Sequence, residues 1–325
     1  MIIVTGGAGF IGSNLVKGLN NLGFDDVLVV DDLETADKYR NLEDCSIDDF
    51  VDKHDFVNLL NTRSALENVE IVFHQGACSN TMETNGRYMM SNNYTYSKQL
   101  LEYCGTRGIP FIYASSASVY GAGQNFTEAP QNENALNIYA YSKLLFDRHV
   151  RRRMVAIQSQ IVGLRYFNVY GPGESHKGRM ASVVYHFQQQ YKKDGYVKLF
   201  KGSDGYGDGE QRRDFVWIGD VVDVNLFFLE HPDVSGVFNV GTGRSESFNT
   251  VATAVINSTT GKQHNTKELI DLGAIRYISF PEDLLGKYQS FTQADISALT
   301  SLGYTTDFKT VAEGVGRYVS SQSAA

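Results

Sequence analysis

Short runs of hydrophobic residues recur along the first half of the chain, and longer stretches of mixed polar and hydrophobic residues separate them. The short runs predict buried strands at 2–5, 27–30, 71–74, 111–115 and 161–166. The longer stretches have the composition and spacing of helices, at 12–22, 52–61, 84–104 and 140–153. Strands that alternate with helices in this way predict an α/β fold, a doubly wound parallel sheet of the Rossmann type with helices on both faces.

The pattern loosens after about residue 167. Residues 171–182 and 201–214 are rich in glycine and charge and predict ordered loops or lids, whereas 214–230 and 236–243 return to helix and strand patterns. We therefore predict two domains. The first comprises 1–167 plus about 214–240, and a smaller, discontinuous α/β lobe comprises 168–213 plus about 241–325.

Composition narrows the range of partners. The net charge of -8 argues against a general nucleic-acid surface, so an anionic ligand would need a local basic pocket. The cysteines Cys45, Cys78 and Cys104 form no CxxC pair, and their odd number favours a reducing compartment. No apolar run approaches the roughly 18 residues of a membrane span. We expect a cytoplasmic protein with no membrane partner and no metal site.

The first strand is followed at once by a cluster of glycines. Residues 7–12 fit GxGxxG at a strand-to-helix junction, where one glycine makes the turn, one admits a pyrophosphate and one allows close helix packing. The helix N-terminus there supplies N–H groups to phosphates. A purely structural turn is the alternative, but the βαβ setting favours a dinucleotide site that includes Gly6, Gly9, Phe10, Ile11 and Gly12.

The end of the second predicted strand carries the next candidates. Asp31 lies nineteen positions past Gly12, where an acidic residue would bond the ribose hydroxyls. A carboxylate there favours NAD, because it would repel the 2′-phosphate of NADP. Lys38, Arg40 and Lys53 lie downstream and would neutralise that phosphate. The residues by themselves leave both cofactors open.

Candidate catalytic groups follow the fourth strand. Ser116 stands at its carboxyl end, where α/β sheets place ligands, and Tyr139 and Lys143 share one face of the next helix. We expect the ammonium to lower the pKa of the phenol, so that Tyr139 exchanges a proton with a substrate alcohol. Lys143 would also reach a cofactor ribose, and Ser116 would hydrogen-bond the reacting oxygen. Tyr-x-x-x-Lys alone is common by chance, but the combination is specific.

Further motifs carry a family resemblance over nearly the whole chain. The segments TGGAGFIG, SSASVYG, RYFNVYGP, RRDFVWIGDV and FNVGTG resemble the extended short-chain dehydrogenase/reductase superfamily. Within it, the sequence is most similar to the ADP-L-glycero-D-manno-heptose 6-epimerase family, through 87–104, 176–183, 286–295 and 308–315.

The resemblance implies bound NADP, an ADP-heptose substrate, epimerisation at C6 in lipopolysaccharide-precursor biosynthesis, and a homo-oligomer, with a pentamer as one form. For the cofactor it implies the glycine-rich turn and Asp31, Asp32, Lys38, Lys53, Gln75, Gly76, Ala77, Cys78, Ser79, Asn92, Lys143, Val169 and Lys177. For the substrate it implies Ser116, Asn168, Arg179, His186, Phe200, Lys201, Gly202, Ser203, Arg213 and Tyr288.

The resemblance also makes Lys177 a second catalytic base beside Tyr139, provided that burial lowers the pKa of its amine. The sequence departs from the family at Asp32, where Asn is familiar, and at Arg179, where a small residue is familiar.

Three other functions are weighed against this one. An NAD-dependent UDP-sugar 4-epimerase uses the same Ser/Tyr/Lys set, but Lys177 favours the heptose enzyme. A 4,6-dehydratase would need an Asp-Glu pair where Ala117 and Ser118 stand, and is rejected. A dinucleotide-binding regulator would be expected to lose Tyr139 or Lys143, and this chain keeps both.

Overall fold

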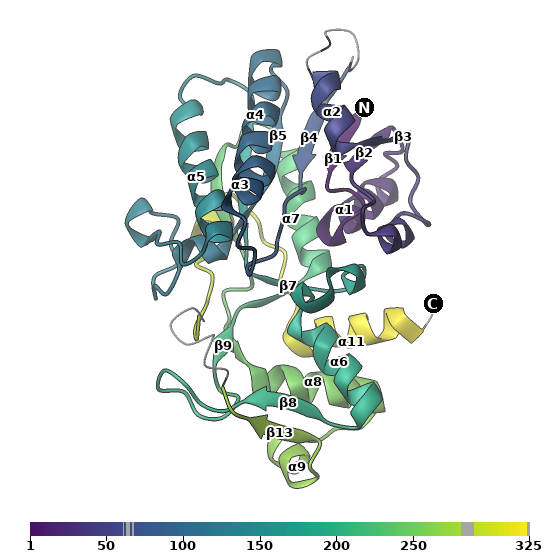
Figure 1. Ribbon diagram of the computed structural model, residues 1–325, viewed down its shortest axis with the longest axis vertical. Coiled ribbons are helices and arrows are strands. Elements are labelled where there is room, and N and C mark those ends of the chain that lie inside the picture. Colours follow the sequence, from purple (N-terminus) through teal and green to yellow (C-terminus); the bar gives the residue numbers. More distant parts are fainter. Residues whose placement is uncertain (61, 63–65, 67, 281–288, 324–325) are drawn as a thin grey trace. The chain divides into compact units, whose positions relative to one another are not determined.

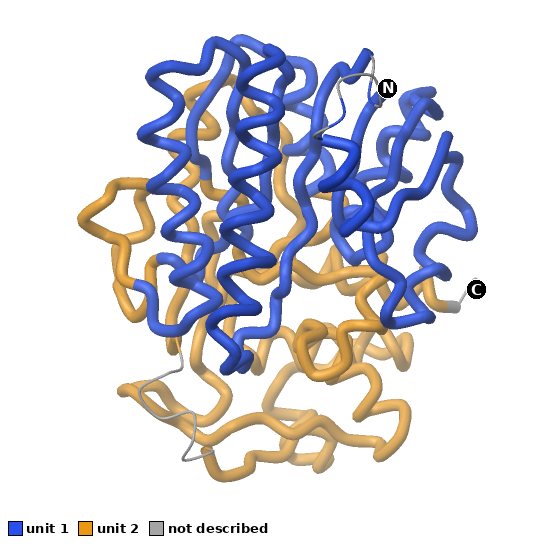
Figure 2. The backbone as a smooth tube through the Cα atoms, turned by 45° about the horizontal axis from the view of Figure 1, so that its top comes forward, with its two compact units in different colours: residues 1–119, 135–166, 221–238 blue, residues 120–134, 167–220, 239–325 orange. Residues whose placement is uncertain are grey.

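The structure is a computed structural model that describes residues 1–60, 62, 66, 68–280 and 289–323. The chain divides into two compact units, which Figure 2 colours separately. Unit 1 comprises Met1–Val119, Ala135–Tyr166 and Val221–Phe238, and unit 2 comprises Tyr120–Asn134, Phe167–Asp220 and Asn239–Ala325. Residues 120–134, which the sequence analysis places in the first domain, therefore cluster in unit 2.

A parallel sheet forms the centre of unit 1. Among the described residues it has seven strands in the order β11-β6-β5-β4-β1-β2-β3, several of which are labelled in Figure 1. Most of these strands are buried throughout, because helices cover both faces of the sheet. Their bounds are β1 Ile2–Thr5, β2 Val27–Asp31, β3 Asp49–Asp52, β4 Ile71–His74, β5 Phe111–Ser116, β6 Ile161–Tyr166 and β11 Gly236–Val240.

Two layers of helices cover this sheet. Side chains of α2, α4 and α5 form one continuous core with residues of β1, β2, β4, β5 and β6. Helices α1 and α7 pack closely on each other, because a Cβ built on Gly18 would lie 2.5 Å from Val222. The helices are α1 Phe10–Asn21, η1 Ala36–Asn41, α2 Lys53–Leu60, α3 Gly86–Met89, η2 Met90–Thr95, α4 Tyr96–Arg107, η3 Ala117–Tyr120, α5 Ile138–Arg153 and α7 Ile218–Glu230.

Unit 2 has its own core and, in the part of it that the structure describes, three short strand pairs. Apolar residues of α6, α8, β13 and α11 meet in that core. β7 Asn168–Tyr170 pairs in parallel with β10 Phe215–Trp217, β8 Val197–Phe200 with β13 Ile275–Ile278, and β9 Arg212–Arg213 pairs in antiparallel with β12 Glu246–Ser247. The helices are η4 Pro130–Asn132, η5 Ser175–Met180, α6 Val183–Asp194, α8 Phe248–Thr260, α9 Thr266–Asp271, α10 Ser297–Ser301 and α11 Val311–Ser323.

The fold confirms the predicted α/β class, and most predicted strands begin and end within a residue of the observed ones. Two features differ. Residues 49–52 form a strand, β3, that the sequence analysis did not predict. The helix predicted over 84–104 is helical from residue 86 to residue 107, but its middle part, η2, is a π-helix between α3 and α4.

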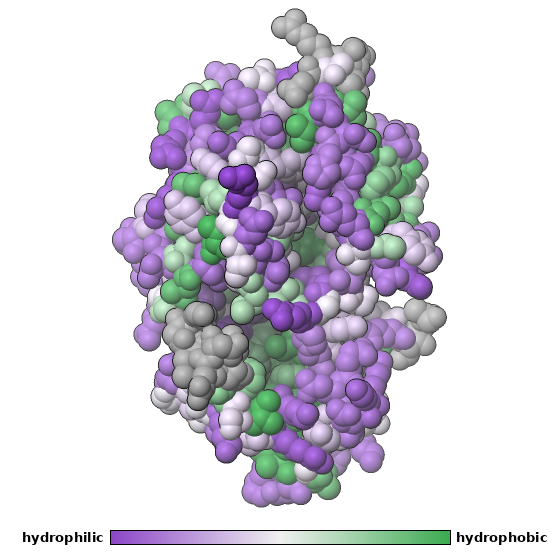
Figure 3. Space-filling view, viewed as in Figure 1, coloured by the Kyte–Doolittle hydropathy of each residue, from purple (hydrophilic) through white to green (hydrophobic). Residues whose placement is uncertain are grey.

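Hydrophilic residues predominate on the face of the molecule drawn in Figure 3. In the described part of the chain, no helix combines the length and the hydropathy that crossing a bilayer requires. Cys45, Cys78 and Cys104 are all free thiols. The described residues also contain no cluster of His, Cys, Asp and Glu able to hold a metal ion.

Candidate active site

The glycine-rich turn between β1 and α1 is built for close backbone approach. Gly6 has φ +69°, and a Cβ on it would lie 2.5 Å from the backbone of Gly76, which follows β4. A Cβ on Gly12 would lie 2.1 Å from the Gly6 carbonyl oxygen. Gly9 is the N-cap of α1, and no side-chain hydrogen bond caps it among the described residues. The twelve-residue helix thus begins with a backbone-lined cradle of the kind that holds a pyrophosphate.

Asp31, at the end of β2, is tied to this turn. Its side chain is buried, and its Oδ2 accepts a hydrogen bond of 2.8 Å from the Ala8 backbone N–H. Its Oδ1 accepts from the Asp32 N–H at 2.7 Å and from Lys38 Nζ at 2.5 Å. One of its oxygens therefore holds the glycine-rich turn in place, a role that the motif alone did not indicate.

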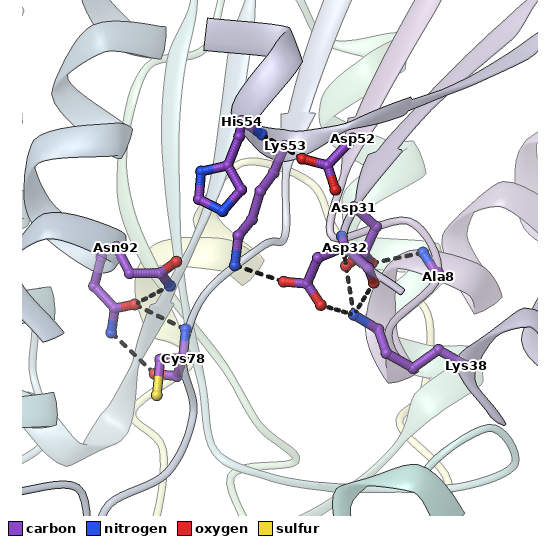
Figure 4. A network of polar contacts seen from close by, with 10 residues as sticks. Ala8, Asp31, Asp32, Lys38, Asp52, Lys53, His54, Cys78 and Asn92 are labelled. Carbon is purple, nitrogen blue, oxygen red and sulfur yellow. Dashed lines mark hydrogen bonds and ion pairs between the residues drawn. The ribbon is translucent and has the colours of Figure 1, made fainter. Parts of the chain in front are cut away.

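Asp32 and two lysines complete an ion-pair chain beside the turn (Figure 4). Lys38 Nζ lies 3.1 Å from Asp32 Oδ1, and Lys53 Nζ lies 2.5 Å from Asp32 Oδ2. Burial acts to raise the pKa of Asp32, but the hydrogen bond from Lys53 and the charges of both lysines outweigh it and lower that pKa. Burial acts to lower the pKa of Lys53, but Asp32 raises it. The structure thus brings together three predicted cofactor residues from three separate segments.

The loop after β4 is anchored by the π-helix. Asn93 in η2 is fully buried, accepts a hydrogen bond from the Cys78 N–H at 2.8 Å and donates to the Cys78 carbonyl at 2.9 Å. It also donates to Ser142 Oγ of α5 at 3.1 Å, and Asn92 donates to its Oδ1. The sequence analysis chose Asn92 and missed Asn93. The paired asparagines inside a predicted helix were the available signal, since π-turns occur often at functional sites.

Ser116, Tyr139 and Lys143 lie together in unit 1. Asn137 caps α5 by accepting from the Ala140 N–H at 2.8 Å, which sets Tyr139 and Lys143 in its first turns. Tyr139 hydrogen-bonds Ser116, at the end of β5, and Lys143 Nζ donates to the Ala114 carbonyl at 2.8 Å. Ser118 Oγ donates to Ser116 Oγ at 2.9 Å. Tyr139 and Ser116 thus form a hydroxyl pair, and Lys143 is bonded to β5 two residues before Ser116.

The pKa values of this cluster correct one expectation. Burial raises the pKa of Tyr139, and the hydrogen bond with Ser116 opposes that rise only in part. The prediction that the phenol pKa is lowered is therefore wrong, because the pKa of Tyr139 is raised. Burial instead lowers the pKa of Lys143 to about 8, against the charge of Asp147. Of these two groups, the amine of Lys143 therefore has the pKa nearer to neutral pH.

A buried ion pair holds α5 against the sheet behind these groups. Asp147, one turn after Lys143, lies 2.9 Å from Arg165 of β6, and both side chains are fully buried. Asp147 also accepts hydrogen bonds of 3.0 Å from Tyr113 and Ser115 of β5. Residues of two strands and one helix thus converge on a single carboxylate. The sequence analysis did not identify this cluster, because its residues lie on separate elements and form no local motif.

In unit 2, Lys177 and Arg179 lie on the short helix η5, where Lys177 is half-buried and Arg179 is exposed. Burial lowers the pKa of Lys177, although Glu174 opposes the shift, which is the direction that the two-base hypothesis requires. Glu174 is fully buried and accepts hydrogen bonds from the backbone of Gly171 and Ser182 on either side of the turn. Glu174 therefore fixes the turn that carries Lys177.

The other candidates of unit 2 are spread over several elements. Arg213 in β9 is buried and lies 5.9 Å from the ring of Phe248. Asn168, in β7 beside Val169, donates its N–H to the Asp214 carbonyl at 3.0 Å, which places β7 next to the residue after Arg213. His186 lies in α6, and Phe200, Lys201, Gly202 and Ser203 lie at the end of β8 and just beyond it. Tyr288 lies outside the described residues.

These observations define a class. A parallel sheet in Rossmann order, with a backbone cradle at the first helix and an acidic residue closing the second strand, is the architecture of a dinucleotide-binding enzyme. The turn that contains Gly6 and Gly12, where an added Cβ would collide with backbone atoms, fits such a cofactor. The chain belongs to the NAD dependent epimerase/dehydratase family, whose model matches residues 2–241.

Individual relatives agree with this family. The chain is 54% identical to an ADP-L-glycero-D-manno-heptose-6-epimerase of Thiobacillus denitrificans, over 98% of this chain and 97% of the relative. The crystal structure of the Helicobacter pylori ADP-L-glycero-D-manno-heptose-6-epimerase is similar at 30% identity and a TM-score of 0.81, covering 100% of this chain and 96% of that one. A Thermus thermophilus UDP-glucose 4-epimerase in complex with NAD is similar at 26% identity and 0.80, covering 100% and 99%.

Proposed function

We propose that the protein is an ADP-heptose 6-epimerase, interconverting ADP-D-glycero-D-manno-heptose and ADP-L-glycero-D-manno-heptose. One observation carries the proposal: the 54% identity to a heptose epimerase extends over 98% of the chain and so includes both units. The presence of Ser116, Tyr139 and Lys143 in one cluster supports a redox epimerase over a regulator that only binds a dinucleotide.

We propose NADP as the cofactor. The support is the basic pair Lys38 and Lys53 beside the residue that closes β2, where the ribose 2′ position would lie. The phosphate would take charge-assisted hydrogen bonds from these ammonium groups. NAD is the alternative, and a 4-epimerase relative holds it.

The chemistry supplied by a bound dinucleotide is hydride acceptance from C6 of the substrate and hydride return to the ketone. Tyr139 is the proposed base for one of the two epimers, and Lys143 is proposed to supply and accept its proton. Ser116 is the proposed hydrogen-bond partner of the reacting oxygen. Because the hydride would leave toward, and return from, the same side of the bound cofactor, the ketone must turn over between the two half-reactions. The alcohol proton then occupies a different place in each epimer, and Lys177 is the proposed second base. Arg213 is the proposed partner of the substrate diphosphate.

The test is a comparison of two substrates. Purified protein is incubated with ADP-D-glycero-D-manno-heptose or with UDP-glucose, and the sugar nucleotides are separated by anion-exchange chromatography. We expect an equilibrium mixture of the two ADP-heptose epimers and no UDP-galactose. Conversion of UDP-glucose alone would replace the proposal with a 4-epimerase, and conversion of neither substrate would refute it.

A further inference from the structure

The two lysines proposed to bind the cofactor phosphate already share an anionic partner. Lys53 Nζ lies 2.5 Å from one carboxylate oxygen of Asp32, and Lys38 Nζ lies 3.1 Å from the other. Lys38 also donates to the Asp32 backbone carbonyl at 2.7 Å. The three side chains are 12% to 20% exposed, so water screens these contacts only in part. Asp32 thus holds both ammonium groups from opposite ends of its carboxylate (Figure 4).

A ribose 2′-phosphate needs the same two donors. At neutral pH a phosphate monoester carries about -1.5 to -2 charges and accepts charge-assisted hydrogen bonds through several oxygens. Asp31 and Asp32 balance Lys38 and Lys53 in the free protein, so the cluster has no net charge to attract such an anion. Asp31 Oδ2 accepts the Ala8 N–H of the glycine-rich turn, and its Oδ1 lies 2.5 Å from Lys38, so Asp31 competes for Lys38 alone. Asp32 contacts both lysines and is therefore the carboxylate that competes with the phosphate for both donors.

We propose that Asp32 acts as a built-in competitor for the 2′-phosphate of the cofactor, and so determines how strongly the protein prefers NADP to NAD. The inference rests on the proposed function only in taking the cofactor to be NADP. Binding of NADP would transfer Lys38 and Lys53 from Asp32 to the phosphate and leave the carboxylate beside a like charge. Binding of NAD would leave the chain of ion pairs intact. Asp32 thus weakens binding of the phosphorylated cofactor and leaves the other largely unaffected.

The test compares two variants by isothermal titration calorimetry on full-length protein stripped of nucleotide. Asp32→Asn keeps the size of the side chain and removes its charge. The matched control is Asp44→Asn, which removes the same charge from an exposed carboxylate that pairs with Lys17 at 2.7 Å. Each protein is titrated with NADP, with NAD, and with the fragments 2′,5′-ADP and 5′-AMP, which differ only in the 2′-phosphate.

We expect Asp32→Asn to tighten NADP and 2′,5′-ADP binding about tenfold, which corresponds to ~1.4 kcal/mol. NAD and 5′-AMP should change less than about twofold, and Asp44→Asn should change none of the four by more than that. Asp32→Ser, a smaller uncharged variant, should shift the same two ligands in the same direction. Unchanged or weaker NADP binding in both Asp32 variants would overturn the inference and leave the epimerase proposal standing. A wild-type protein that binds neither dinucleotide would overturn both.

Discussion

At the scale of single residues, the proposed chemistry depends on two bases. Tyr139→Phe and Lys177→Met should each lower the epimerisation rate at least about a hundredfold, as expected for removal of a general acid–base group. Bound cofactor should be retained, because neither side chain carries the glycine-rich turn. Rates are measured by chromatography of the ADP-heptoses, and cofactor by its absorbance after protein denaturation.

Matched controls exist for both changes. Tyr141→Phe alters an exposed tyrosine on the same helix as Tyr139, and Lys193→Met alters an exposed lysine at the end of α6. Both controls should keep near wild-type rates. If Lys177→Met also epimerises at a wild-type rate, Lys177 is not a base and Tyr139 works alone.

Lys143 gives a second prediction at this scale, for stability against pH. Burial lowers its pKa in the folded protein to about 8, from 10.5 for the free amine. Below pH 8 the amine is charged in both states, and the cost of burying that charge is fully present. Between pH 8 and 10.5 the unfolded chain binds more protons, so the free energy of unfolding rises with pH. The Lys143→Met variant lacks this rise.

Urea unfolding of both proteins at several pH values between 7 and 10 measures the effect. Relative to Lys143→Met, the wild type should gain up to about 3 kcal/mol over the full interval. Lys193→Met serves as the control for loss of one exposed charge. A difference between wild type and Lys143→Met that stays constant across this range would show that the amine titrates alike in both states.

At the scale of elements, the junction of α5 with β5 and β6 depends on the Asp147–Arg165 pair. Asp147→Asn removes the carboxylate charge that pairs with Arg165 in a fully buried place, which should lower the free energy of unfolding by about 3–5 kcal/mol. Urea unfolding at pH 7 measures the loss. Glu102→Gln breaks the surface pair with Arg153 and should cost less than about 1 kcal/mol. Equal losses in the two variants would contradict the role given to the buried pair.

Some secondary-structure elements could be predicted from the sequence, and others could not. Strands such as β1 and β4 were predicted at their observed residues, because three apolar residues in a row within a short run are a local signal of a strand buried on both faces. β3 was missed because its sequence, DFVD, begins and ends with acids and its pairing with β2 is set by residues far along the chain. Asn93 of the π-helix was missed as a site residue because its hydrogen bond with Cys78 joins two separate segments of the chain.

The sequence predicted which residues belong to the candidate site, but not the contacts among them. The sequence analysis named Asp31, Lys38 and Lys53 as candidates for one site, and the structure brings them together, although Lys53 follows β3, a strand that was not predicted. The pairing of both lysines with Asp32, and the burial that raises the pKa of Tyr139, follow from tertiary packing, so no local pattern reported them.

At the scale of the whole molecule, the proposed function draws on both units: the glycine-rich turn and Tyr139 belong to unit 1, and Lys177 and Arg213 belong to unit 2. Arg213→Ala should raise KM for ADP-heptose by about tenfold to a hundredfold, since a charge-assisted hydrogen bond contributes roughly 1.5–3 kcal/mol. The value of kcat should change much less. Steady-state kinetics separate the two. Arg317→Ala, an exposed arginine of α11, is the control, and an unchanged KM in Arg213→Ala would remove Arg213 from the substrate site.

The fate of the hydrogen at C6 of the substrate tests the proposed epimerase mechanism most directly. ADP-D-glycero-D-manno-heptose deuterated at C6 is incubated with the full-length protein in ordinary water without added dinucleotide, and both epimers are analysed by mass spectrometry and NMR. If the hydride leaves and returns within one bound complex, the ADP-L-glycero-D-manno-heptose formed should keep its deuterium at C6. A product that carries solvent hydrogen at C6, or the absence of any product, would contradict an epimerase that works by transient oxidation.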